Sequence, residues 1–192
     1  MSITTIIPVP SDKVAASKGA TRLPSVKGST VGIMFNIKQN GSELLSAIGD
    51  LLREQHDAKA VLPPVKTAGI YLPTEEQLKD VADKADMVLV GLGDCGSCSA
   101  CSVQVAAEFE RAGVPAVAIC TTPFLKSGQA MAARQGLPNL RFVTIEHPLS
   151  SLTIDELRER AKEAVSQVVS IVCADDELNK SEAAALADSW AA

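Results

Sequence analysis

Short apolar runs alternate with longer amphipathic stretches along the central part of this chain. The runs predict five β-strands, at residues 30–35, 58–62, 87–90, 115–119 and 141–145. Each is followed by apolar residues at helical spacing. Such alternation is typical of a parallel sheet covered on both faces by helices. The expected fold class is α/β: a single-domain three-layer sandwich with a five-stranded, mostly parallel sheet in the flavodoxin-like order 2-1-3-4-5.

The two ends of the chain lack this alternation. Residues 1–28 are rich in Ser, Pro, Lys and Thr, and we expect an N-terminal arm that crosses the surface of the domain or of a partner subunit. Residues 29–173 form the expected α/β catalytic domain, and the acidic, alanine-rich residues 174–192 are expected to form a C-terminal helical tail. Both ends suit an interface, so a homodimer is among the expected assemblies.

Composition and charge disfavour several classes of protein. Aromatic residues make up only 3% of the chain, which disfavours a base-stacking surface, and the net charge of −5 disfavours binding to a phosphate backbone. No apolar run approaches the ~20 residues of a membrane helix, and the first ten residues do not resemble a secretory signal. We therefore expect a cytoplasmic protein that acts on a small-molecule substrate, with no nucleic-acid and no membrane partner.

The carboxyl ends of the predicted strands carry the candidate chemistry, because ligands of an open parallel sheet bind beyond these ends. At or just beyond them lie Asn36, Lys38, Asp94, Cys95, Thr121, Thr122 and His147. Since the first and third strands are neighbours in the expected order, Asn36 and Lys38 should lie beside Cys95. We predict that His147 is a catalytic acid or base. The substrate-binding groups are predicted to be Asn36, Lys38, Asp94, Gly96, Ser97, Thr121 and Thr122.

Three of the five cysteines, Cys95, Cys98 and Cys101, lie within seven residues. We expect Cys95 near the first position of a helix capped by Asp94, where unpaired backbone N–H groups stabilise a thiolate. Cys98 follows on the same face, close enough to resolve a mixed disulfide or sulfenic acid on Cys95. Cys101 is turned about 120° from Cys95 and is expected to face the core.

Several interpretations of the cluster remain open. The first is thiol-dependent redox chemistry, and the second is a nucleophilic cysteine of a lyase, transferase or hydrolase that forms a covalent adduct without disulfide cycling. The third is a non-enzymatic metal-binding or ligand-binding module, since Cys-x-x-Cys-x-x-Cys is also a cluster pattern. A segment that enters a helix at once does not wrap around a cluster, so we predict no metal. Residues 91–96 fit G-x-G-x-x-G, but the next strand lacks a terminal acidic residue, so no cofactor is expected.

Residues 95–98 (Cys-Gly-Ser-Cys), 108–115 (EFERAGVP) and 147–149 (His-Pro-Leu) together resemble the UGSC family, which is named for a selenocysteine-Gly-Ser-Cys motif. The similarity covers roughly residues 28–165. The resemblance implies that Cys95 occupies the selenocysteine position. A selenol serves nucleophilic or redox chemistry, so Cys95 is implied as the attacking atom with Cys98 as its partner.

Overall fold

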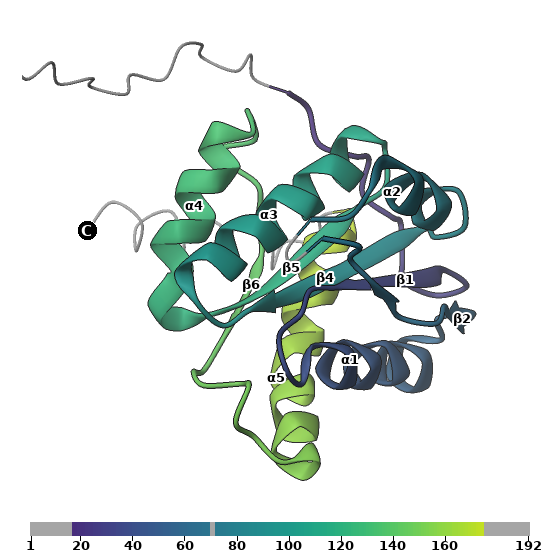
Figure 1. Cartoon of the computed structure of the whole chain (residues 1–192). Coiled ribbons are helices and arrows are strands. Elements are labelled where there is room, and N and C mark those ends of the chain that lie inside the picture. Colours follow the sequence, from purple (N-terminus) through teal and green to yellow (C-terminus); the bar gives the residue numbers. More distant parts are fainter. Residues whose placement is uncertain (1–16, 70–71, 175–192) are drawn as a thin grey trace, which may run out of the picture.

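The computed structural model describes residues 17–69 and 72–174 of the 192-residue chain (Figure 1). Its elements in chain order are β1 (Thr30–Phe35), α1 (Gly41–His56), β2 (Ala60–Val61), β3 (Val65–Lys66), α2 (Glu75–Ala82), β4 (Met87–Gly93), α3 (Gly96–Arg111), β5 (Ala116–Thr121), the 3-10 helix η1 (Thr122–Phe124), α4 (Leu125–Arg134), β6 (Val143–Ile145) and α5 (Ile154–Val172). The strands pair in parallel in the order β2-β1-β4-β5-β6. This confirms the α/β class and the flavodoxin-like order.

The sheet has six strands rather than the expected five, because its first edge is divided. Both β2 and β3 pair with β1, the former near Thr30 and the latter near Phe35. Between them lie Pro63 and Pro64, which have no backbone N–H to donate to a ladder. The prolines end β2, as expected. The sequence did not predict β3, because two residues are too few to show the alternation of a strand.

Helices cover both faces of the sheet (Figure 1). Alternate strand residues belong to the two core clusters on its two faces. Ile33, Leu89 and Ile119 pack in one core cluster with residues of α1 and α5. Their neighbours Met34, Val88 and Ala118 pack in a second cluster with residues of α2, α3 and α4. The three-layer sandwich is therefore confirmed.

Part of the predicted N-terminal arm, residues 17–28, lies across the surface of the domain itself. Leu23 forms a parallel bridge with Cys173, at the end of α5. The guanidinium of Arg22 forms an ion pair with Glu110, whose side chain is completely buried at the end of α3. A buried carboxylate needs such a partner, so this contact anchors the arm to the domain.

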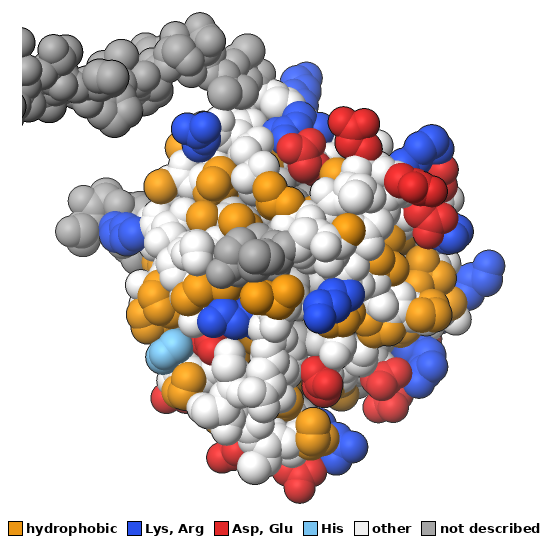
Figure 2. Space-filling view, in the orientation of Figure 1, with side chains coloured by type: hydrophobic (Ala, Val, Ile, Leu, Met, Phe, Trp, Pro, Cys, Tyr) orange, Lys and Arg blue, Asp and Glu red, His pale blue; other side chains and the backbone are white. Residues whose placement is uncertain are grey.

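The first sixteen residues of the arm, and residues 175–192 of the predicted C-terminal helical tail, lie outside the described residues. Among the described helices, none combines the length and the apolar character that a membrane crossing requires. Figure 2 shows charged side chains of both signs around one face of the molecule, with hydrophobic groups exposed between them.

Candidate active site

The parallel sheet brings the predicted site residues to one edge, with β4 between β1 and β5. Asn36 follows β1 and is buried; its Nδ2 donates to the carbonyl of Leu92 at 3.1 Å, and its Oδ1 accepts the N–H of Lys38 at 3.0 Å. These two bonds fix the start of the β1–α1 loop against β4. Lys38 lies close enough for its charge to act on Cys95, as the strand order predicts.

Cys95 is itself the N-cap of α3, whereas the sequence predicted that Asp94 would cap a helix beginning at Cys95. The backbone of Cys95 is extended (φ −160°, ψ 168°), and the helix begins at Gly96. Its Sγ accepts the backbone N–H of Cys98 at 3.3 Å and lies 3.5 Å from the hydroxyl of Ser97. The sulfur thus takes the place of the oxygen that usually caps a helix.

The Cys98 side chain is completely buried beneath Cys95 and donates a hydrogen bond to its sulfur. Burial, this hydrogen bond and the charge of Cys95 raise the pKa of Cys98 to about 12, so its thiol stays protonated at neutral pH. The two cysteines lie together as predicted. Cys101 is only half-buried, so the expectation that it faces the core is wrong. The predicted angle between the cysteines assumed that Cys95 is helical, and it is not.

The pKa of Cys95 results from opposed effects. Burial raises it, but hydrogen bonds from the Cys98 thiol and the Ser97 hydroxyl lower it, as do the N–H of Cys98 and the charge of Lys38. The net result is a pKa below the ordinary value for a thiol. In contrast, burial raises the pKa of each of the other four cysteines, Cys98, Cys101, Cys120 and Cys173. Cys95 is therefore the cysteine whose surroundings favour a thiolate.

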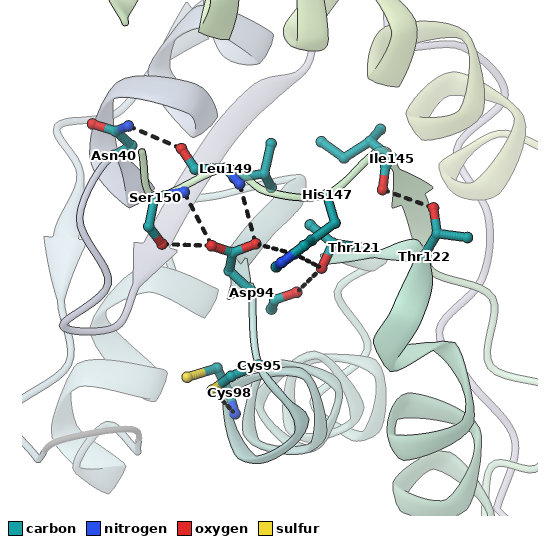
Figure 3. Close-up of polar contacts among 11 residues, drawn as sticks. Asn40, Asp94, Cys95, Cys98, Thr121, Thr122, Ile145, His147, Leu149 and Ser150 are labelled. Atoms are coloured by element: carbon teal, nitrogen blue, oxygen red, sulfur yellow. Dashed lines mark hydrogen bonds and ion pairs between the residues drawn. The ribbon is translucent and has the colours of Figure 1, made fainter. Parts of the chain in front are cut away.

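The carboxylate of Asp94 binds the loop after β6 instead of capping the helix (Figure 3). It accepts the N–H of Leu149 at 3.1 Å, and both the N–H and the hydroxyl of Ser150 at 3.0 and 2.6 Å. The Nδ1 atom of His147 lies 3.0 Å from Oδ1 of the same carboxylate. Asp94 thereby fastens this loop to the end of β4, and it is only 8% exposed.

His147 stands in this loop with its ring at the surface of the same edge; its side chain is 38% exposed. Nδ1 also lies 3.3 Å from the hydroxyl of Thr121, which donates to the carbonyl of Gly93 at 3.2 Å. The ring meets Phe124 edge-on, with centroids 5.6 Å apart. These contacts hold one side of the imidazole and leave the other accessible.

The two predicted catalytic groups reach the same edge but belong to separate networks. Figure 3 shows the sulfur of Cys95 directed away from Asp94 and His147. We name the group of Lys38, Cys95, Ser97 and Cys98 the sulfur side. The group of Asp94, Thr121, His147, Leu149 and Ser150 is named the carboxylate side. The site therefore offers a thiol of lowered pKa and an imidazole from different sides of one strand end.

The remaining predicted residues have mainly local contacts. The hydroxyl of Thr122 donates to the carbonyl of Ile145 at 3.0 Å, at the start of η1. Gly96 is half-buried and Ser97 is exposed, so the first turn of α3 is open at the surface. A carbon added at Gly96 would meet only Ser127, at 3.5 Å, so this position has room.

Sequence reasoning missed two residues that build the site. Ser150 makes two of the hydrogen bonds to Asp94, and Asn40 donates to the carbonyls of Leu149 and Leu152, both at 2.9 Å. Both are polar residues in loops at the carboxyl ends of strands, and that position was the signal available to find them.

The described residues contain no group of three or more His, Cys, Asp or Glu side chains that could hold a metal ion. A cavity of about 440 Å³ lies at the other end of the strands and is lined by Arg22, Glu110 and Arg141, among others. Arg22 and Glu110 are paired with each other, and Arg141 binds Ser170. We therefore place the candidate chemistry at the cysteine edge, where a thiol and an imidazole are accessible.

Comparison with known proteins supports the resemblance carried by the Cys-Gly-Ser-Cys and His-Pro-Leu segments. A search of curated proteins finds no match to the chain. The sequence profile of the UGSC family matches residues 4–174, which include every residue of the sulfur side and of the carboxylate side. Because this match covers most of the chain, the protein belongs to the UGSC family.

Proposed function

We propose that this protein is a thiol-dependent oxidoreductase of a small molecule, with Cys95 as the nucleophile and Cys98 as the resolving thiol. The observation that carries the proposal is the sulfur pair. Contacts lower the pKa of Cys95, while burial keeps Cys98 protonated and hydrogen-bonded to it. At one pH, Cys95 is thus suited to attack a substrate, and Cys98 is placed to form a disulfide with it afterwards.

A hydroperoxide is the simplest substrate class for this pair. The Cys95 thiolate attacks the terminal oxygen of R–O–O–H, the O–O bond breaks, and Cys95 becomes a sulfenic acid. The alkoxide R–O⁻ takes up a proton and leaves as an alcohol; His147, which reaches the same edge from the carboxylate side, is the proposed proton donor. The Cys98 sulfur then attacks the Cys95 sulfur; an S–S bond forms, and the hydroxyl leaves as water with the Cys98 proton. A dithiol, of the kind present in the expected cytoplasm, reduces the disulfide and is itself oxidised.

The test is oxidation of the reduced full chain with hydrogen peroxide, followed by intact-mass measurement and thiol titration. We expect the mass to fall by two hydrogens and two thiols to disappear, with peptide mapping that assigns a Cys95–Cys98 disulfide. The variant Cys98→Ser should stop at a sulfenic acid on Cys95 that dimedone traps. The matched control Cys101→Ser should form the disulfide like the wild type. If the wild type only gains oxygen atoms, the redox proposal is wrong.

A second candidate is a Cys95 nucleophile that forms a covalent adduct without disulfide cycling. The observation that favours it is the complete burial of Cys98, since a protonated thiol with a pKa of about 12 is a weak nucleophile. The same oxidation experiment separates the two. A sulfenic acid on Cys95 in the wild type, equal in yield to that of Cys98→Ser, would favour the adduct chemistry.

A further inference from the structure

We infer that Asp94 is a positioning residue, which holds a proton on Nδ1 of His147 and so makes Nε2 the ring atom that exchanges protons with a substrate. The use of His147 in a reaction rests on the proposed function. The position of the proton on the ring is a property of the protein alone and can be measured without a substrate.

Four polar groups surround the carboxylate of Asp94. Oδ1 is approached by the N–H of Leu149 and by Nδ1 of His147, and Oδ2 by the N–H and hydroxyl of Ser150. A carboxylate only accepts hydrogen bonds, so each neighbour must donate. Nδ1 therefore carries a hydrogen, because a bare Nδ1 would place two lone pairs 3.0 Å apart.

Thr121, at the end of β5, also faces Nδ1 of His147. Its hydroxyl is completely buried and donates its single hydrogen to the carbonyl of Gly93. Its Oγ1 lies 3.3 Å from Nδ1 of His147, and it can therefore only accept a hydrogen bond from that nitrogen. Thr121 is the last residue of β5 and Asp94 directly follows β4, and both contacts favour the same tautomer of the ring.

With the hydrogen on Nδ1, the other ring nitrogen of His147 is Nε2. In the neutral ring, Nε2 holds a lone pair, and in the imidazolium it holds the second proton. The polar contacts of this ring with other described residues all involve Nδ1. Nε2 is therefore the nitrogen that remains for a substrate.

The loop itself keeps the ring in place while this exchange occurs. The carbonyl of Leu149 accepts from Asn40 at the start of α1, and its N–H donates to Asp94 at the end of β4. Leu149, two positions after His147, is thus held both from the start of α1 and from the end of β4. Asp94 acts on the ring in two ways, because it accepts the Nδ1 proton and anchors the backbone that carries the ring.

The experiment is nitrogen NMR of the full chain labelled with ¹⁵N at histidine, at a pH where both imidazoles are neutral. Long-range proton–nitrogen correlations distinguish a protonated ring nitrogen from one with a lone pair. The chain has two histidines, so the variant His56→Gln assigns the signals of His147. We expect the Nδ1–H form of His147 to exceed the Nε2–H form by roughly tenfold or more. A predominant Nε2–H form in the wild type would overturn the inference.

Variants separate the positioning role from a general structural one. Asp94→Asn leaves a single acceptor oxygen for the same donors, and we expect the excess of Nδ1–H to fall at least roughly threefold. Ser150→Ala is the matched control, because it removes a donor to Asp94 without touching the ring, and it should keep the wild-type tautomer. An unchanged tautomer in a folded Asp94→Asn would also overturn the inference. If that variant does not fold, the wild-type spectrum still decides.

The two proposals fail in different experiments. A wild type without a Cys95–Cys98 disulfide after oxidation contradicts the redox function and leaves the tautomer of His147 unaffected. An Nε2–H tautomer contradicts the role of Asp94 and leaves the sulfur chemistry unaffected.

Discussion

Asp94 and Cys95 are neighbours in the chain, yet they differ in burial and in the number and length of their hydrogen bonds. Asp94 is nearly buried, and four donors from one loop approach its carboxylate. Cys95 is half-buried, and its sulfur has longer contacts, at 3.3 and 3.5 Å. The comparison teaches that a fully bonded group holds structure, while a group with weak, accessible contacts remains free to react.

The largest effect should follow from Asp94→Ala. This change leaves the N–H groups of Leu149 and Ser150 without their acceptor, and each such loss costs about 1–3 kcal/mol. We expect the free energy of unfolding to fall by about 3 kcal/mol or more, measured by urea denaturation. Cys95→Ala should cost less than about 1 kcal/mol, and the exposed control Asp50→Ala less than about 0.5 kcal/mol. Equal losses for Asp94→Ala and Cys95→Ala would break the comparison.

The pH dependence of stability should distinguish the two sulfurs. The pKa of Cys98 is raised to about 12, so its stabilising contribution is complete below the ordinary thiol value of about 8.5 and is lost as the pH rises toward 12. The pKa of Cys95 is lowered, so its contribution is present above the ordinary value and is lost as the pH falls. Cys98→Ala should flatten the decline of unfolding free energy above about pH 8.5 by up to about 1.4 kcal/mol per pH unit.

Cys95→Ala should not flatten that decline, because the lowered pKa of Cys95 makes its ionisation favour the folded state as the pH rises. Urea denaturation at a series of pH values measures both variants. If the two variants flatten the decline equally, the opposite pKa directions of the sulfur pair are wrong.

The reactivity of Cys95 should depend on Cys98 more than on any other side chain. The Cys98 thiol is the strongest of the contacts that lower the pKa of Cys95. Cys98→Ala should slow alkylation of Cys95 by iodoacetamide at neutral pH by about tenfold, because a smaller fraction of the sulfur is then ionised. Peptide mass spectrometry over time gives the rate. Cys101→Ala is the control and should leave the rate within about twofold.

Lys38 should have a smaller effect on the same rate. Its charge lowers the pKa of Cys95, but it acts from a half-buried position and is the weakest of the four contacts. Lys38→Met should slow alkylation at neutral pH by about threefold, and Lys38→Arg should largely preserve it. The wild-type rate should approach that of Lys38→Met in high salt, because ions screen the charge. If the alkylation rate of the wild type does not change with salt, the charge of Lys38 does not contribute to the reactivity of Cys95.

The smallest effect is expected for His147→Gln. Because His147 belongs to the carboxylate side and the sulfur of Cys95 points away from it, the alkylation rate of Cys95 should stay within about twofold of the wild type. A loss of tenfold or more would mean that the imidazole contacts the sulfur in solution, and the division of the site into two networks would be incorrect.

The arrangement of the sheet and the position of the site follow from the sequence because both depend on regular rules. Fully apolar runs such as residues 87–90 mark central parallel strands, and parallel strands end at one edge. Those two rules suffice to bring Lys38 near Cys95 from segments almost sixty residues apart.

The role of Asp94 does not follow from the sequence, because local and distant contacts compete for it. By local preference, Asp is a far better helix cap than Cys, so the sequence favours Asp94 at the start of α3. In the folded chain, the N–H groups of Leu149 and Ser150, more than fifty residues away, take the carboxylate. The cap then passes to Cys95, and the sulfur acquires the hydrogen bonds that favour its ionised form.

The divided first edge of the sheet also affects how copies of this chain can meet. An uninterrupted outer strand exposes a row of backbone donors and acceptors onto which another molecule can add a strand of its own. Here that border consists of two-residue pieces separated by Pro63 and Pro64, and the opposite border, β6, is only three residues long. Among the described residues, neither border therefore offers a long strand onto which another copy could add one of its own.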